Sequence, residues 1–456
     1  MGLYVQMHSM HGLLRGEDAE LGRDEDTGGQ IIYVLNLARA LGRLEDVDRV
    51  DIVTRRIVDE SYPGYSLPTE DLGQGVRIVR VECGPRRYIK KVDLWPYMDE
   101  FIGNCKRLIE KVGRPGILHS NYADSGYVCA RLSRELGIPQ VHTGHSLGKP
   151  KMERLGVTDE NFDEFDRVYH FSARLEAEQL TIDNAAAIIV STDVERYLQY
   201  SMYAIDTDDS RFHVVHPGVD LAQFHPQSRE GKGPARERLQ RMLDVSLDAP
   251  ERPMILAMAR LDFKKNLISL LKAYAYDPEL CARANLILVT GRDGKMGKNE
   301  QLLMDEMTTL IAERRLERQV CIVRHIEYPA EAGEIYRLAA SSGGVFVNPA
   351  LHEPFGITII EAAATGLPVV ATNNGGPTEI VEACENGLLA EPRDTRQIAD
   401  AVKRVLEDRR LWQRFSERGI ERVREHYTWD ATARSELAVF RHAIERWRAA
   451  HVAAPE

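Results

Sequence analysis

The sequence predicts an α/β protein with two doubly wound domains, each built on a parallel sheet. Three observations lead to this class. Short apolar runs such as Val345–Val347 lack polar alternation, which is typical of strands buried on both faces. Amphipathic helical stretches alternate with these runs, and glycine-containing polar loops join them. A chain of 456 residues exceeds what one hydrophobic core usually supports, so two domains are expected.

Composition restricts the partners and the compartment. The net charge of −11 argues against nucleic acid or an anionic membrane as a general partner. The six cysteines are scattered without a C-x-x-C pair, so neither a zinc site nor a disulfide framework is expected. No apolar run approaches membrane-spanning length, and the first ten residues lack a basic leader segment. We therefore expect a cytoplasmic protein that binds neither nucleic acid nor membrane.

The first domain is expected to span residues 1–218. Its helix over 163–183 should turn Phe165, Val168, Phe171, Leu175 and Leu180 inward. The expected strands are 3–7, 50–54, 76–81, 117–119, 139–143 and 187–191, and further helices are expected from 31 and over 127–136.

The second domain is expected to span residues 219–429, with a final helix at about 430–456 packing back on the first domain. The expected strands are 254–259, 286–290, 320–323, 345–347 and 367–372. The expected helices are 357–365, one beginning at Pro377, and a pair over 395–426.

The densest cluster of signals in the chain is the segment from Gly343 to Ile380. Gly356 precedes a predicted helix, and the backbone of Ile357 and Thr358 at its start is suited to hold a phosphate. Glu353 lies just before this helix and Glu361 eight residues later, inside it. Carboxylates placed among anion-binding N–H groups are suited to accept hydrogen bonds from sugar hydroxyls. Capping of the helix dipole is the alternative role for the two acids.

This segment resembles a known signature. E-P-F-G-x-x-x-x-E is similar to the E-x7-E motif of retaining, nucleotide-sugar-dependent glycosyltransferases, whose GT-B fold places two Rossmann-like domains across a cleft. The resemblance implies that Glu353 contacts the donor sugar and Glu361 the nucleotide ribose. It also implies a donor site that includes Phe355, Gly356, Ile357 and Thr358.

Two cations of the second domain complete the donor site that the resemblance implies. Arg260 and Lys265 hold the diphosphate in the family. Fixed positive charge stabilises a departing diphosphate most strongly in the transition state. A surface ion pair between Arg260 and Asp262 is the alternative.

A long loop near the N-terminus narrows the resemblance to one family of these glycosyltransferases. The run H-G-L-L-R-G-E-D-A-E-L-G-R-D-E-D-T-G-G-Q is similar to the N-terminal loop of the sucrose synthase and sucrose-phosphate synthase family. Two glycines at a helix start allow a ligand to approach the backbone closely, while a turn that needs positive φ is the alternative. We assign Gly29 to the donor, and Gly28 and Gln30 to the acceptor.

The segment T-G-H-S-L-G-x-x-K after the predicted strand 139–143 resembles the sucrose-phosphate synthases. The resemblance implies that His145 contacts the donor sugar and that Ser146 and Lys151 hold the acceptor and its phosphate. Three further acceptor residues are assigned: Lys91, four positions before Trp95, together with Tyr122 and Arg174. The family has two adjacent arginines where this chain has Ala173 and Arg174.

The implied reaction transfers glucose with retention from UDP-glucose to fructose 6-phosphate, giving sucrose 6-phosphate and UDP. Its expected catalytic residues are His145, Arg260, Lys265 and Glu353, and no metal or other cofactor is expected. A mannosylfructose-phosphate synthase using GDP-mannose, a UDP-sugar epimerase and a non-catalytic nucleotide-sugar binder are the alternatives. A dehydrogenase is disfavoured because the chain has no G-x-G-x-x-G. The sequence carries no indication of an oligomeric state.

Overall fold

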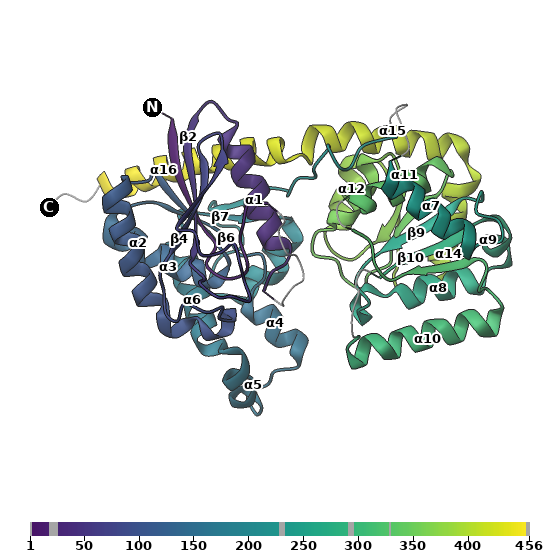
Figure 1. Cartoon of the computed structure of the whole chain (residues 1–456), viewed down its shortest axis with the longest axis horizontal. Coiled ribbons are helices and arrows are strands. Elements are labelled where there is room, and N and C mark those ends of the chain that lie inside the picture. The colour runs from purple at the N-terminus through teal and green to yellow at the C-terminus, as the bar shows by residue number, and fades with distance from the viewer. Residues whose placement is uncertain (1, 18–25, 228–232, 291–295, 328–329, 453–456) are drawn as a thin grey trace. The chain divides into compact units, whose positions relative to one another are not determined.

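The computed structural model describes residues 2–17, 26–227, 233–290, 296–327 and 330–452. The chain divides into two compact units (Figure 1). Unit 1 is Met1–Pro217 with Trp429–Glu456, and unit 2 is Gly218–Thr428. The division expected from the sequence differs from this one by a single residue at each crossing.

Unit 1 is built on an eight-stranded sheet with the order β3-β4-β2-β1-β5-β6-β7-β8. All neighbouring strands are parallel except β3 (Thr69–Gly73), which runs antiparallel to β4 at one edge. The edge strand was not predicted because the sequence TEDLG has no apolar run. The remaining strands are β1 (Leu3–His8), β2 (Val47–Arg55), β4 (Val76–Val81), β5 (Ile117–Asn121), β6 (Gln140–Thr143), β7 (Ala187–Val190) and β8 (Phe212–Val214).

Helices cover both faces of the unit 1 sheet. Helices α1 (Gly29–Gly42) and α16 (Trp429–Val452) pack on one face, and α2 (Met98–Val112) and α3 (Tyr122–Leu136) pack on the other. Helix α3 begins five residues earlier than predicted. Three further helices are α4 (Gly148–Leu155), α5 (Phe162–Tyr169) and α6 (Phe171–Asn184).

The prediction of a single helix over 163–183 is wrong. His170 adopts φ +50° and separates α5 from α6, because a left-handed residue ends an α-helix. Val168, expected to face inward, is 59% exposed. Phe171, just after the break, is fully buried as predicted.

Unit 2 contains a six-stranded, wholly parallel sheet with the order β11-β10-β9-β12-β13-β14. Its strands are β9 (Met254–Met258), β10 (Asn285–Val289), β11 (Val320–Val323), β12 (Val345–Asn348), β13 (Val369–Thr372) and β14 (Gly387–Ala390). Burial of both faces explains why most of these strands read as continuous apolar runs.

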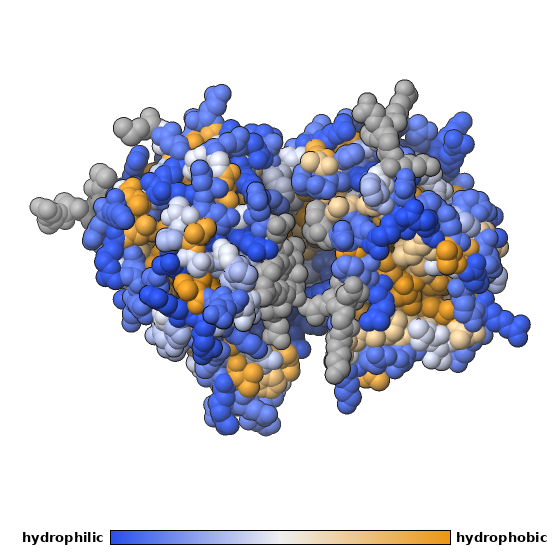
Figure 2. Space-filling model, viewed as in Figure 1, coloured by the Kyte–Doolittle hydropathy of each residue, from blue (hydrophilic) through white to orange (hydrophobic). Residues whose placement is uncertain are grey.

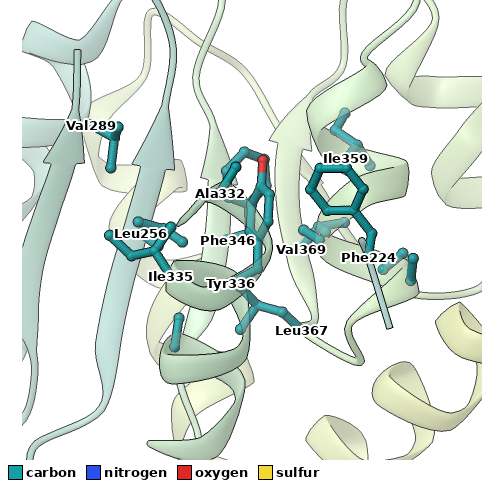
Figure 3. Packing of buried hydrophobic residues seen from close by; sticks show 14 of the residues in the cluster. Phe224, Leu256, Val289, Ala332, Ile335, Tyr336, Phe346, Ile359, Leu367 and Val369 are labelled. Carbon is teal, nitrogen blue, oxygen red and sulfur yellow. The ribbon is translucent and has the colours of Figure 1, made fainter. Parts of the chain in front are cut away.

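Two hydrophobic clusters sandwich the unit 2 sheet. One contains residues of α7 (Pro234–Ser246), α11 (Ala330–Ser341), α12 (Ile357–Ala364) and α13 (Pro377–Cys384). In this cluster Phe346 of β12 packs edge-on against Tyr336 of α11, with ring centroids 5.4 Å apart (Figure 3). The other contains residues of α8 (Leu267–Ala275), α9 (Pro278–Arg283), α10 (Lys298–Arg314) and α14 (Thr395–Glu407). Helix α15 (Arg409–His426) contributes to both.

The order of the parallel strands reverses once in each sheet, between β1 and β5 in unit 1 and between β9 and β12 in unit 2. Ligands of open α/β sheets bind beyond the carboxyl ends of the strands at such a reversal. A ligand site is therefore expected in the segments that follow these strands.

In the described part of the chain, every helix is too short or too polar to cross a membrane. Hydrophilic residues predominate over the face of each unit seen in Figure 2, and hydrophobic residues form separate groups among them.

Candidate functional site

The centre of the unit 2 half-site is an ion pair between the loops that follow β9 and β12. The Lys265 Nζ lies 2.6 Å from Glu353 Oε2, and the Asn348 amide donates to the same oxygen at 3.3 Å. Both charged side chains retain some exposure, 28% for Lys265 and 12% for Glu353. The pair is thus held in place while staying accessible to a ligand.

Backbone contacts fix Glu353. Its N–H donates to the carbonyl of Asn374 at 3.1 Å, and Gly376 N–H donates to the Glu353 carbonyl at 2.9 Å. Gly375, between Asn374 and Gly376, has φ +109°, and a Cβ there would lie 2.1 Å from the backbone carbonyl oxygen of Glu353. The close approach of the two loops requires glycine at this position.

The loop after β9 is tied to the same block. Leu351 N–H donates to the carbonyl of Lys264 at 2.8 Å. The Asn266 side-chain amide donates to the carbonyls of Pro349 and Pro392 at 2.9 and 2.8 Å. These bonds fasten the segments that carry Lys265 and Glu353 to one another.

Arg260 differs from Lys265 and Glu353: it is exposed, and its guanidinium has no hydrogen bond or ion pair to any described residue. The alternative pairing with Asp262 is wrong. The Asp262 carboxylate instead accepts a hydrogen bond from Lys264 N–H at 2.9 Å and caps a short helical turn.

Helix α12 begins beside Glu353. Gly356 is its N-cap at φ +108°, Ile357 is 38% exposed and Thr358 is half-buried. The first N–H groups of a helix lack intrahelical partners, which favours an anion at this end. Phe355 packs toward Tyr427, with ring centroids 6.4 Å apart.

Glu361 lies deeper than the other predicted donor residues. It is 1% exposed, and its Oε2 accepts a hydrogen bond from the Tyr336 hydroxyl at 3.1 Å. The ribose contact implied for Glu361 stays a prediction.

His145 is the centre of the unit 1 half-site, directly after β6. Its Nε2 lies 2.9 Å from Asn121 Oδ1, and the Asn121 amide nitrogen donates to the His8 carbonyl at 3.4 Å. This orientation makes Oδ1 the acceptor, which assigns the imidazole proton to Nε2 and leaves Nδ1 to accept a hydrogen bond. Burial, with His142 and His11 nearby, lowers the pKa of His145 to about 3, so the ring is neutral.

Two of the predicted acceptor residues, Lys91 and Arg174, lie against a third, Tyr122, and Lys151 is close enough to both cations for their charges to act on it. Lys91 Nζ and Arg174 Cζ lie 5.4 and 4.8 Å from the centre of its ring. Lys151 Nζ lies 4.2 Å from the ring centre of Tyr169, and burial together with Arg174 and Lys91 lowers the Lys151 pKa to about 8. Such mutual repulsion between cations is relieved when an anion binds among them.

Two of these cations have carboxylate partners. Lys91 Nζ lies 3.0 Å from Asp26, whose carboxylate also accepts from the Lys91 N–H at 2.8 Å. Arg174 is 4% exposed, pairs with Glu178 at 2.9 Å and donates to the carbonyl of Ser146 at 2.8 Å. Arg174 therefore also supports the segment that follows His145.

The two glycines at the start of α1 are exposed, and a Cβ at either would meet no atom within 4 Å. Gly28 has φ −132°, so the alternative of a positive-φ turn is wrong for this residue. Gln30 donates from its side chain to Ser9 Oγ at 3.2 Å. Residues 18–25 of the preceding loop lie outside the described part of the chain.

Several polar residues of the unit 1 half-site were not predicted. Asn121 orients His145, Asp26 pairs with Lys91, and a buried pair joins His11 Nδ1 to Asp124 at 2.7 Å. Asn121 stands at the end of a strand, which is the signal that could have identified it. Among the described residues, no group of three or more His, Cys, Asp or Glu is arranged to hold a metal ion.

Two family models and several relatives match the chain. The family model "Glycosyl transferases group 1" matches residues 241–422, and "Sucrose synthase first GT-B domain" matches residues 76–242. Sucrose-phosphate synthase 4 of Arabidopsis thaliana is 36% identical over 97% of this chain and 48% of its own length. Sucrose-phosphate synthase of Zea mays is 38% identical over 95% of this chain and 47% of its own length. The chain spans about half the length of the curated relatives it matches.

A solved structure matches the fold along nearly its whole length. The sucrose-phosphate synthase of Thermosynechococcus elongatus superposes with a TM-score of 0.72 at 28% identity, covering 97% of this chain and 99% of its own. Two doubly wound units with these matches define the GT-B glycosyltransferase fold, as the sequence predicted. Within that class, the chain is similar to sucrose-phosphate synthases over nearly its whole length, and its residues 76–242 match the sucrose synthase first GT-B domain.

Proposed function

We propose that this chain transfers glucose from UDP-glucose to fructose 6-phosphate, with retention, and releases sucrose 6-phosphate and UDP. The relatives that match it across nearly its whole length bear the name sucrose-phosphate synthase, which supports this reaction.

One observation carries the proposal: Lys91, Lys151 and Arg174 converge beside the loop that carries His145. Three cations in one place match a dianionic phosphate on the acceptor. An epimerase or a simple nucleotide-sugar binder takes no second, phosphorylated substrate and has no use for this cluster.

The donor is assigned to unit 2. Arg260 and Lys265 receive the diphosphate, together with the N–H groups at the start of α12, and Glu353 accepts hydrogen bonds from the hexose. The resemblance assigns a sugar contact to His145 as well, and its Nδ1 is left to accept a hydrogen bond. These groups bind and orient by hydrogen bonds and charge, and we propose that the reaction needs no metal.

In the proposed step the acceptor hydroxyl attacks the anomeric carbon on the face from which UDP leaves. The bond between that carbon and the β-phosphate oxygen breaks as the new glycosidic bond forms. The hydroxyl proton passes to the departing phosphate oxygen. Arg260 and Lys265 stabilise the negative charge that grows there.

The test measures nucleotide release with UDP-glucose and GDP-mannose, each with and without fructose 6-phosphate. We expect UDP only when UDP-glucose and fructose 6-phosphate are both present, with sucrose 6-phosphate as the co-product. GDP release would assign a mannosyl donor instead. UDP release without acceptor would indicate a hydrolase, and no release from either donor would contradict the acceptor assignment.

A further inference from the structure

Two buried polar atoms in unit 1 face each other without any hydrogen bond. Glu436 Oε2, on α16, and His119 Nδ1, on β5, are 3.5 Å apart, and neither has a hydrogen-bond partner among the described residues. Both residues are fully buried. An unsatisfied buried polar atom is costly, at about 1–3 kcal/mol, so this juxtaposition calls for an explanation.

The other polar atoms of the same two residues are engaged. The Tyr33 hydroxyl donates to Glu436 Oε1 at 2.5 Å. His119 Nε2 lies 2.9 Å from Thr143 Oγ1. Thr143 also acts as a hydrogen-bonding neighbour of the Tyr33 phenol and lowers its pKa, against the stronger effects of burial and Glu436 that raise it. Four side chains from α1, β5, β6 and α16 thus meet in one buried cluster.

We propose that Thr143, Tyr33, Glu436 and His119 form a closed ring of four hydrogen bonds through a neutral Glu436, and that this ring positions His145. Thr143 donates to Tyr33, Tyr33 to Glu436 Oε1, protonated Oε2 to His119 Nδ1, and His119 Nε2 back to Thr143. A single proton on Glu436 therefore satisfies both orphaned atoms. The proposal for His145 rests on the function proposed above.

The ring acts on His145 from two sides. Thr143 lies two residues before it in the chain, and the Tyr33 ring packs edge-on against the imidazole with centroids 4.9 Å apart. His145 needs such support because its φ of +56° is uncommon for a residue other than glycine. Fixing the Tyr33 hydroxyl fixes the ring that holds the imidazole opposite Asn121.

The titratable groups that face the cluster agree with the neutral form. Burial raises the pKa of Glu436 to about 8, although Tyr33 opposes the shift. Burial, with His145, His142 and His8 nearby, lowers the pKa of His119 to about 3, which disfavours an ion pair with a protonated His119. Glu195, the other carboxylate that acts on Tyr33, is occupied by the N–H and hydroxyl of Ser191 at 2.8 and 2.7 Å.

The first test is infrared spectroscopy of the protein near neutral pH, against the variant Glu436→Gln. Most carboxyl groups are ionised there, and the difference between the two spectra separates the carbonyl stretching band of a protonated Glu436 from that of another buried carboxyl such as Glu195, whose pKa burial also raises. We expect this band in the protein and its absence in the variant, with loss of the band as the pH rises past about 8. Absence of the band from the unaltered protein would overturn the ring, and this readout does not depend on transferase activity.

The second test compares kcat in substitutions that break or preserve the ring. Tyr33→Phe keeps the aromatic ring but removes two of the four bonds, and kcat should fall at least about tenfold because His145 loses its fixed orientation. Glu436→Gln supplies a donor and an acceptor at the same places, so its kcat should stay within about threefold of the parent. Tyr197→Phe and Glu445→Gln, at exposed positions, serve as matched controls.

The outcomes separate the two parts of the proposal. A loss in Glu436→Gln as large as in Tyr33→Phe would show that a charge is needed and would overturn the neutral ring. An unchanged kcat in folded Tyr33→Phe, with the infrared band present, would overturn the positioning role alone. If the unaltered protein transfers no sugar at all, the proposed function fails, and the infrared band still decides the ring.

Discussion

The two half-sites hold their positive charges in different ways. In unit 1, Lys91 and Arg174 are neutralised by the carboxylates of Asp26 and Glu178 before any ligand binds. In unit 2, Arg260 is exposed and has no ion pair to a described residue, while Lys265 shares one with Glu353. Buried cations need internal counter-ions because desolvation is costly, whereas exposed cations are stabilised by water.

This difference distinguishes cations that support the fold from cations that are available to a ligand. Arg174 holds the loop after His145 in place as well as facing the proposed phosphate. Lys151 has no carboxylate within ion-pair distance among the described residues, so it is the unit 1 counterpart of Arg260. Among the described cations of the two half-sites, Lys151 and Arg260 are thus available to a ligand, while the others are already used by the fold.

The largest expected effect is on stability, when a paired, buried cation and an unpaired, exposed cation are removed in turn. Arg174→Met leaves the buried Glu178 carboxylate without its cation and should lower the free energy of unfolding by about 3 kcal/mol. Arg260→Met removes an exposed charge and should change it by less than about 0.5 kcal/mol. Chemical denaturation of both variants measures the difference, and equal losses would contradict the distinction.

The next effect is on turnover. Lys265→Ala should lower kcat about 100-fold or more, because one preorganised positive charge on the leaving diphosphate is lost. The adjacent Lys264→Ala removes an exposed lysine and is the matched control. Both variants should keep the circular dichroism spectrum of the parent. Near-normal turnover in folded Lys265→Ala would remove this residue from the catalytic assignment.

The smallest effect is a pH dependence. The Lys151 ammonium is charged below its pKa of about 8 and loses its charge above it, so the KM for fructose 6-phosphate should rise as the pH passes that value. Bound phosphate raises the pKa of this ammonium in the complex, so the rise in KM begins at the pKa of the free enzyme and levels off above the pKa of the complex. Lys151→Arg stays charged and should flatten the profile. The same steep rise in Lys151→Arg would assign the titration to another group.

Periodicity predicted most of the fold because buried parallel strands read as plain apolar runs. The predicted and observed bounds of β4 and β11 agree, and β12 extends one residue further than predicted. The pattern fails where local sequence is overridden or silent. TEDLG forms β3 only because β4 offers an edge, and His170 breaks a helix that the amphipathic pattern continues through.

The candidate site shows the same limit of prediction from sequence. Residues within motifs, such as His145, Lys265 and Glu353, could be assigned from short segments of sequence. The contacts that hold them come from distant parts of the chain. Tyr33 and Glu436 are separated by 403 positions, and no local pattern links them. Asn348 and Gly375 support Glu353 through geometry that only the folded loops create.

The most direct test of the central assignment, nucleotide on unit 2 and sugar phosphate on unit 1, is calorimetric titration of UDP into two charge-removing variants. Arg260→Met should weaken UDP binding about tenfold or more, since an exposed cation on a phosphate is lost. Lys151→Met should leave the UDP Kd within about twofold of the parent. An unchanged Kd in Arg260→Met, or a tenfold weaker one in Lys151→Met, would contradict the assignment.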